Sequence, residues 1–218
     1  MTTTADVQII QATREHTPFV AWLVLAATRS HLPKSGWDLL LGDDEQRVLR
    51  YLEVFADTAQ IHWGHWSQFL IAEVDGVPAA GMMGYLENEQ PVSVMFAGAT
   101  EATKKFGITP EEWAAGWERA KSMANIGYPH EAGAWVVEHV ATRPEYRRRG
   151  LVERLIHETL DRGRERGAKT ADIGVLIGND KAQHAYEKCG FVVVGEVRDA
   201  EFEQVYGSPG ALALSRPL

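Results

Sequence analysis

The sequence predicts an α/β layer architecture, and three observations support this prediction. In the last third of the chain, strand-like segments alternate with amphipathic helix-like segments, which is typical of a sheet with a parallel pairing inside it. Upstream, two strand-like segments flank an Asp-Gly pair, which predicts a hairpin. The chain has 218 residues, 45% of them hydrophobic, enough to bury one core without disulfides or metals. We therefore expect a single domain over 1–218, with a helical insertion over 87–133.

Patterns in the first half of the chain predict two helices and three strands. Apolar residues recur at helical spacing in two segments, and Asp43 or Asp44 can cap the second because their carboxylates accept from free N–H groups. Gly76 accepts the positive φ that a tight hairpin turn requires. The expected elements are a strand over 7–11, helices over 17–30 and from 43 or 44 to about 60, and strands over 69–74 and 78–86.

The inserted segment and the last third carry clear helix and strand signals. Thr109 is a candidate N-cap, Pro110 fits the first helical position, and Glu112 would complete a capping box. This helix should run to about Met123, and a loop with proline and glycine should follow it. The remaining expected elements are strands over 135–141, 171–177 and 191–197, helices over 151–166 and 179–188, and a final edge strand over 211–215.

Charge and composition narrow the function classes. The formal net charge is −8, and an acidic surface repels nucleic acid phosphates while it favours cationic substrates such as amines. The longest apolar segment, 19–27, is half of the ~18 residues that a bilayer span needs, so we expect a core helix and no membrane partner. The start, MTTTADVQIIQ, is unlike a secretory signal, and the single cysteine, Cys189, excludes an intramolecular disulfide. We therefore expect a cytoplasmic protein.

The segment 137–152 has the features of a site for a phosphorylated ligand. It consists of a strand, a proline turn, the arginines Arg147, Arg148 and Arg149, and Gly150 at the start of a helix. The first N–H groups of a helix have no internal partner and lie at its positive dipole end, where pyrophosphate binds readily. The alternative is a solvated helix start, but basic residues there are unfavourable without an anion. The glycine spacing in this segment matches neither the phosphate loop of nucleoside triphosphate sites nor that of dinucleotide sites.

Two motifs resemble those of the GNAT superfamily of N-acetyltransferases. The acetyl-CoA motif of that family is usually written Gln/Arg-x-x-Gly-x-Gly/Ala; here Arg147 fills the first position and Gly150 the fourth. Val152 stands where glycine or alanine is usual. The segment 179–191 is similar to the family's second motif, Asn-x-x-Ala-x-x-x-Tyr-x-x-x-Gly-Phe. The matched region covers about 135–195.

The resemblance implies a fold and a cofactor site. The fold would have a central mixed, mostly antiparallel sheet flanked by helices, with one strand splayed from its neighbour so that its backbone pairs with pantetheine. Backbone groups of the splayed strand would meet the pantetheine arm, N–H groups of the loop would hold pyrophosphate, and the amide of Val140 would polarise the thioester carbonyl. The implied acetyl-CoA site comprises Val140, Ala141, Thr142, Arg147, Arg148, Arg149, Gly150, Leu151, Val152, Asn179, Ala182 and Tyr186.

The implied chemistry is direct attack of an amine on a thioester. A primary amine has a pKa near ~10, so a proton must leave before attack. Tyr186 is the candidate acid that protonates the departing thiolate; otherwise it is a core tyrosine. Glu138 and His139 are adjacent on a strand and should face opposite sides of the sheet, so only one can face the cleft. Counting from Val140 favours Glu138 as the base, with a water chain to a more distant carboxylate as the alternative.

Other features have structural explanations beside functional ones. His62 and His65 lack the partner cluster of a metal site, so we expect no metal; they could border the acceptor pocket or simply pack under a loop. Trp113 and Trp117 are four residues apart, the spacing of a packing stripe. Cys189 is expected to be a small buried hydrophobe rather than an acyl carrier.

The sequence therefore predicts an N-acetyltransferase that moves an acetyl group from acetyl-CoA to a primary amine by direct transfer in a ternary complex. The acceptor could be a small molecule or a peptide. The rival prediction is a sensor module of the same fold that binds acyl-CoA without turnover. A nucleic-acid-associated protein is disfavoured by the acidic balance. The sequence leaves open the acceptor, longer acyl groups, a homodimer, and whether 87–133 is a lid, a dimer contact or an acceptor wall.

Overall fold

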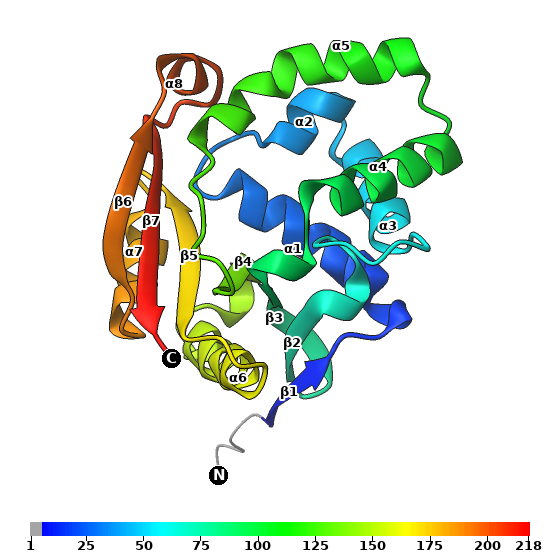
Figure 1. Cartoon of the computed structure of the whole chain (residues 1–218). Coiled ribbons are helices and arrows are strands. Elements are labelled where there is room, and N and C mark those ends of the chain that lie inside the picture. Colours follow the sequence, from blue (N-terminus) through cyan, green and yellow to red (C-terminus); the bar gives the residue numbers. More distant parts are fainter. Residues whose placement is uncertain (1–5) are drawn as a thin grey trace.

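A single mixed sheet forms the centre of the molecule (Figure 1). The computed structural model describes residues 6–218; residues 1–5, the start of the segment compared with a secretory signal, lie outside the described residues. The strand order is β1-β2-β3-β4-β5-β7-β6, and within 6–218 only β4 and β5 pair in parallel. The strands are β1 Val7–Gln11, β2 Phe69–Val74, β3 Val77–Leu86, β4 Trp135–Thr142, β5 Thr170–Leu176, β6 Val192–Arg198 and β7 Gly210–Pro217.

Helices cover both faces of this sheet. The five helices α1 to α5 lie together on one side of Figure 1, opposite β5, β6 and β7, and α6 lies at the bottom of that view. The helices are α1 Thr17–Arg29, α2 Gly36–Leu41, α3 Glu45–Ala56, α4 Val92–Phe106, α5 Pro110–Ala120, α6 Leu151–Glu165, α7 Asp180–Lys188 and α8 Ala200–Tyr206, with a 3-10 segment, η4 Lys121–Ile126, after α5.

Two hydrophobic clusters mark the two faces of the sheet. Side chains alternate along each strand, so Phe69, Met83 and Val136 pack with α1 and α3 on what we call the α1 face. Their neighbours Met82 and Val137 pack with α6 and α7 on the opposite face, the α6 face. The predicted mixed, mostly antiparallel sheet flanked by helices is therefore confirmed.

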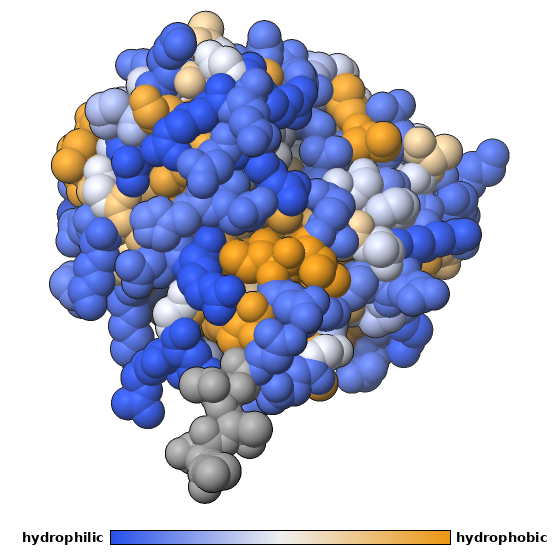
Figure 2. Space-filling view, turned by 90° about the horizontal axis from the view of Figure 1, so that it is seen from below, coloured by the Kyte–Doolittle hydropathy of each residue, from blue (hydrophilic) through white to orange (hydrophobic). Residues whose placement is uncertain are grey.

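The face of the molecule seen from below is mostly hydrophilic, with an apolar area near the middle of the view (Figure 2). The helix α6, at the bottom of Figure 1, is amphipathic: it buries Leu155, Ile156 and Leu160 against the sheet and carries charged residues between them. Within residues 6–218, we find no helix that combines the length and the apolar character of a membrane span.

Several predicted elements agree closely with the structure. The strands over 7–11 and 69–74 have the predicted bounds, and the helix over 17–30 differs by one residue. Asp44 caps α3 by accepting a hydrogen bond from the amide of Gln46 at 3.0 Å. In the β2–β3 hairpin, Asp75 and Gly76 have φ values of 52° and 76°, so both central residues have the positive φ of a type I′ turn.

Other predictions about the elements were wrong. The strand near the C-terminus, β7, is not at an edge: it lies between β5 and β6, and the edge strands of the sheet are β1 and β6. Pairing with distant strands decides this position, and a local pattern does not encode it. The helix α3 ends at Ala56 rather than near residue 60. Thr109 does cap α5, but the carboxylate of Glu112 pairs with Arg47 instead of completing the capping box.

The segment 87–133 forms the 3-10 helix η3 Glu87–Glu89, then α4, α5 and η4. The sequence did not predict α4, which has no side-chain cap at its start and buries only the small residues Gly98, Ala99 and Ala102. A Cβ on Gly98 would lie 2.2 Å from the ring of His62, so only glycine permits this close approach. Trp113 packs against the core on the α1 face, as predicted for the tryptophan pair. After η4, the chain returns across the sheet to β4.

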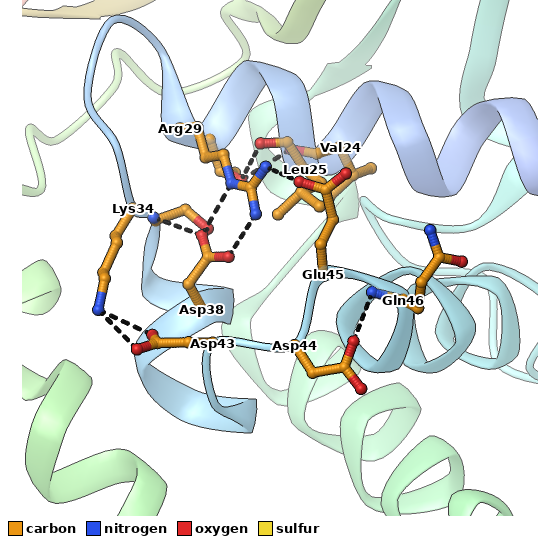
Figure 3. Close-up of polar contacts among 11 residues, drawn as sticks. Val24, Leu25, Arg29, Lys34, Asp38, Asp43, Asp44, Glu45 and Gln46 are labelled. Carbon is orange, nitrogen blue, oxygen red and sulfur yellow. Dashed lines mark hydrogen bonds and ion pairs between the residues drawn. The ribbon is translucent and has the colours of Figure 1, made fainter.

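An ion-pair cluster joins α1, α2 and α3 (Figure 3). Arg29, at the end of α1, donates to Asp38 of α2 at 2.6 and 3.1 Å and to Glu45 of α3 at 2.5 Å. The Asp38 carboxylate, which is only 3% exposed, also accepts from the amide and hydroxyl of Ser35 at 2.7 Å each. Burial raises the pKa of Asp38, but the bonds from Arg29 and Ser35 outweigh it and hold this pKa below its ordinary value.

Candidate active site

The two parallel strands β4 and β5 separate to form a fork. They pair only from Trp135 to Val137 on β4 and from Ala171 to Ile173 on β5. Beyond these residues β4 continues to Thr142 alongside β3, and β5 continues to Leu176 alongside β7. In the described part of the chain, the side of β4 that faces β5 therefore has no strand partner after Val137. The fork exposes backbone groups that can bind a ligand.

A β-bulge lies in β4 just past the apex of the fork. Met83 of β3 pairs with Glu138 and Gly81 with Ala141, so β4 has one extra residue. His139 adopts a positive φ of 54°. Its ring lies 5.1 Å from that of Trp63 and 6.0 Å from that of Phe69, both on the α1 face.

The bulge overturns one prediction. Glu138 and His139 do not face opposite sides of the sheet; both lie on the α1 face, because the extra residue interrupts the alternation. Val140 consequently packs against the cluster on the α6 face. Burial and the nearby His62 lower the pKa of His139 to about 4, so its ring is neutral near pH 7. Its Nε2 is buried, and no hydrogen-bond partner for it occurs among the described residues.

A cavity of about 220 Å³ opens on the α1 face at the apex of the fork. Its floor includes Glu138 of β4 and Asp172 and Gly174 of β5. Its roof is the loop that follows η4, including Tyr128 and His130. This arrangement places a small pocket, partly open to solvent at Tyr128 and Val194, directly beside the residues where β4 and β5 diverge.

Glu138 is the carboxylate of the cavity without an ion-pair partner in residues 6–218. Burial raises its pKa, although the positive charge of His130 and the hydroxyl of Tyr85 act in the opposite direction. Tyr85 is buried, and burial and the charge of Glu138 both raise its pKa, so it remains protonated. A carboxylate with a raised pKa in a cavity has the properties of a general base.

A second acidic group of the cavity is neutralised locally. His130 Nδ1 lies 3.2 Å from Asp172 Oδ2, and this contact joins the loop after η4 to β5. The hydrogen bond to Asp172 raises the pKa of His130, although burial opposes it. The pKa of Asp172 is lowered: burial raises it, but the bonds from His130 and Ser215 outweigh this effect. The two groups therefore form an ion pair.

The loop between β4 and α6 exposes the helix N-terminus that the sequence predicted. Gly150 has a φ of 72°, and a Cβ there would meet nothing within 4 Å. Arg148 also has a positive φ, 61°, and Arg147 to Gly150 are exposed. The first helical hydrogen bond runs from Arg154 to the carbonyl of Gly150, and no described residue accepts from the amides of 148–153. Unpaired N–H groups at a helix start can bind an anion, and we call this group of amides the anion cradle.

The residues around the cradle fit a pantetheine–pyrophosphate ligand. The hydroxyl of Thr142, at the end of the splayed strand, is buried and has no hydrogen-bond partner among the described residues. Such an orphaned polar atom is expected where a polar ligand binds. Val152, which replaces the usual small residue, packs its side chain against the core on the α6 face. Its bulk is thus directed away from the loop.

The second motif lies on α7, at the other arm of the fork. Asn179 accepts from the amide of Ala182 at 3.3 Å and donates to the hydroxyl of Ser30, at the end of α1, at 2.7 Å. One N–H of its amide is left for a ligand. Tyr186 is 6% exposed and shares the α6-face cluster with Ala182. Burial raises its pKa, as does the neighbouring Cys189, so its hydroxyl is protonated near neutral pH.

His62 and His65 are engaged in local hydrogen bonds beside the fork. Nδ1 of His62 accepts from the amide of Gly64 at 3.0 Å, so its Nε2 donates, 3.1 Å from the carbonyl of Phe55. Nδ1 of His65 accepts from the amide of Ser67 at 3.2 Å. Neither ring lines the cavity. No cluster of three or more metal-ligating side chains occurs in residues 6–218.

Sequence reasoning missed three groups of the site: Tyr85, His130 and Asp172. They come from β3, from the loop after η4 and from β5, and only the assembled sheet brings them together. Asp172 could have been noticed, because it is a charged residue within an otherwise apolar strand. Tyr85 and His130 carry no comparable signal. Cys189 is buried at 5% exposure, as a small hydrophobe would be.

Comparisons with known proteins agree with this geometry. The sequence pattern of the Acetyltransferase (GNAT) family matches residues 39–191. A search of curated protein sequences found no match. The solved structures with a similar fold include one described as an acetyltransferase, with a TM-score of 0.69 and 18% identity over 96% of this chain and 98% of that one.

Two further similar structures have named activities. An N-acetyltransferase from Staphylococcus aureus Mu50 has a TM-score of 0.65 and 19% identity over 96% of this chain and all of that one. A polyamine N-acetyltransferase from Drosophila melanogaster, which forms N-acetylagmatine, has a TM-score of 0.55 and 15% identity over 98% of this chain and all of that one. At these identities the likeness shows the fold, and the family follows from the sequence pattern. The chain belongs to the GNAT family of acetyltransferases.

Proposed function

We propose that the protein transfers an acetyl group from acetyl-CoA to a primary amine by direct transfer in a ternary complex. Membership of the family implies an acyl-CoA donor, and amine acceptors are typical of its enzymes. The observation that supports the proposal most strongly is the fork, which has the anion cradle of α6 beyond its β4 arm and the Glu138 cavity at its apex. A donor in the fork and an acceptor in the cavity would meet at the bulge of β4.

The proposed donor site uses the residues of both motifs. The amides from Arg148 to Val152 bind pyrophosphate, and Arg147 and Arg149 add positive charge around it. Backbone groups of Val140, Ala141 and Thr142 pair with the pantetheine arm, with Asn179 and Ala182 on the opposite arm of the fork. The amide of Val140 points its dipole at the thioester oxygen, which bears negative charge as the amine adds.

The proposed reaction needs one base and one acid. Glu138 removes a proton from the ammonium group, directly or through one water, so that the nitrogen lone pair can attack the thioester carbon. The carbon–sulfur bond then breaks, and the hydroxyl of Tyr186 protonates the departing thiolate. The second proton that leaves the nitrogen as the amide forms restores the Tyr186 hydroxyl. Acetyl-CoA supplies the activated acetyl group. The products are the N-acetyl amine and coenzyme A.

Titration calorimetry with acetyl-CoA, coenzyme A and ATP tests the donor site. We expect micromolar binding of both CoA species and much weaker binding of ATP. Replacing Gly150 with alanine should raise the Kd for acetyl-CoA by about tenfold or more, because it strains the φ of 72° and places a Cβ in the cradle. Gly107→Ala is the matched control: its φ is 83°, a Cβ there is also free of contacts, and it lies at the end of α4.

The control separates two explanations of the Gly150 effect. Both variants bear a similar backbone strain, so both should lose similar stability. Only Gly150→Ala should weaken CoA binding. Equal binding by the two variants would contradict the cradle as the pyrophosphate site. Absence of CoA binding to the unmodified protein would contradict the proposed function itself.

Replacing Tyr186 with phenylalanine tests the acid. We expect kcat to fall by roughly 10²-fold with little change in KM, because a positioned acid contributes about 10²–10⁴-fold and the substitution removes only one oxygen. Tyr206→Phe is the control, since Tyr206 is also buried and its hydroxyl donates to the carbonyl of Ala120 at 3.2 Å. Full turnover by Tyr186→Phe at saturating substrate would show that Tyr186 is a core residue only.

The rival function is an acyl-CoA sensor without turnover. The buried, protonated Tyr186 and the cavity at the fork favour an enzyme, because a sensor needs neither. Release of free thiol in the presence of a panel of primary amines distinguishes the two. Binding of acetyl-CoA without thiol release for any amine would favour the sensor.

A further inference from the structure

The charge balance and size of the Glu138 cavity identify the class of acceptor. Resting on the proposed function, we infer that the acceptor is a small monoamine with a compact apolar body, bound in this cavity with its one ammonium group at Glu138. The ion pair of His130 and Asp172 closes one side of the cavity without attracting a second cation. Diamines, polyamines and lysine side chains of peptides are then poor acceptors.

The charges of the cavity indicate that the acceptor has a single ammonium group. The acidic and basic side chains of the cavity are Glu138, His130 and Asp172, beside the phenol of Tyr128. His130 and Asp172 compensate each other at 3.2 Å, and their side chains are 27% and 11% exposed. Glu138 has no ion-pair contact among the described residues, so the three groups together leave one net negative charge, at Glu138. A buried site favours a ligand whose charge matches its own, so one ammonium group is expected and a second would lack a counter-charge.

The size and lining of the cavity indicate that the body of the acceptor is compact and apolar. Apart from these groups, the walls include Ile126, Val136, Val194 and Leu212. A volume of about 150 Å³ is enough to hold benzene, so the observed 220 Å³ has room for a ring of that size with a short amine arm. Apolar walls favour such a body over a flexible polar chain, which would lose its hydration without new hydrogen bonds.

The roof limits the length of the acceptor. A Cβ on Gly195 of β6 would lie 2.3 Å from the ring of Tyr128, so this ring rests directly on the backbone of the edge strand. His130 fixes the same loop to β5. The loop is thus attached to the sheet at two points, on either side of the cavity. A long or branched acceptor would have to displace one of these contacts.

The experiment compares kcat/KM by thiol release for four acceptors: 2-phenylethylamine, 1,4-diaminobutane, spermidine and a short lysine-containing peptide. We expect 2-phenylethylamine to exceed each of the others by at least about tenfold, which corresponds to one unmatched charge or a poor fit. Equal or better turnover of the diamine, spermidine or the peptide would overturn the inference while it supports the proposed amine transfer. Absence of thiol release with all four would overturn both.

Two variants test whether this cavity makes the selection. Gly174 lies on its floor, and a Cβ there would meet nothing within 4 Å. Gly174→Leu should therefore fill the cavity and lower kcat/KM for 2-phenylethylamine by about tenfold or more, with the Kd for acetyl-CoA unchanged. Ala132→Leu, an exposed position of the roof loop outside the cavity lining, is the matched control. Equal effects of both, or none of either, would place the acceptor elsewhere.

A third variant tests whether the ion pair of His130 and Asp172 selects against a second cation. His130→Gln removes the partner of Asp172 and leaves this carboxylate free to receive a cation. The ratio of kcat/KM for 1,4-diaminobutane to that for 2-phenylethylamine should then rise by about tenfold. An unchanged ratio, in a variant that still binds acetyl-CoA, would overturn the role of the ion pair.

Discussion

Replacing Glu138 with glutamine is expected to lower kcat/KM by about 10²–10⁴-fold, the usual contribution of a general base. Glutamine keeps the size of the side chain and cannot accept the proton of an ammonium group. The Kd for acetyl-CoA should not change, because Glu138 lies on the α1 face at the apex of the fork and the cradle lies at the start of α6. Steady-state kinetics and titration calorimetry measure the two quantities separately.

The pH dependence gives the Glu138 prediction a second readout. Burial raises the pKa of Glu138. The ionised form, which acts as the base, therefore appears at a higher pH than in an ordinary glutamate. The acidic limb of the kcat/KM profile should therefore lie above the ordinary pKa of glutamate, ~4.3. In the glutamine variant this limb should disappear, since the group that titrates is absent.

A matched control isolates the role of this carboxylate. Glu87→Gln makes the same change in a second acidic residue whose charge acts on Tyr85 and His130 but which does not line the cavity. Its effect on kcat/KM should stay within about threefold, as for surface charge changes near a site. If Glu138→Gln retained the wild-type rate and profile, the base would be another group reached through water, and Asp172 would be the next to test.

The motifs and the elements that carry them could be predicted because their signals are local. Gly150 with its preceding arginines marks a helix start, Asn179 caps the next helix, and Asp75-Gly76 makes the hairpin. Each depends on residues within a few positions of one another. The mostly apolar character of β4 and β5 likewise follows from the two faces that these strands bury.

The parts that could not be predicted depend on contacts between distant residues. After the bulge at His139, the side chains of β4 lie on the opposite faces of the sheet from those that simple alternation predicts. The sequence from Trp135 to Thr142 gives no sign of this bulge, because the residue with the positive φ is a histidine and not a glycine. The place of β7 inside the sheet is set by its two neighbours. Likewise, His130 pairs with Asp172 only because the loop after η4 folds back against β5. The residues of the proposed acceptor cavity could therefore be identified only from the structure.

Replacing Arg29 with methionine is expected to destabilise the fold by about 3–5 kcal/mol, because it leaves the buried carboxylate of Asp38 without its counter-charge. The double variant Arg29→Met with Asp38→Asn should recover most of this loss, since no buried charge remains. Lys34→Met is the matched control: it breaks the exposed pair of Lys34 with Asp43, seen in the same cluster in Figure 3, and should cost at most about 1 kcal/mol. Urea unfolding measures all three.

The pH dependence of the Arg29 effect has a defined sign. The pKa of Asp38 is lowered in the fold, so its ionised form stabilises the protein fully above the unfolded pKa, near 3.8, and the stabilisation is lost as pH falls through the folded value. In Arg29→Met the loss of the counter-charge raises the pKa of Asp38, so protonation relieves the variant's penalty first. The difference between wild type and Arg29→Met should therefore shrink as the pH falls from about 7 to below about 4. A difference that stayed constant across this range would mean that Arg29 acts through packing of its stem alone. Ser30, the residue after Arg29, accepts from Asn179 at 2.7 Å, so the ion-pair cluster lies next to a contact between α1 and the fork.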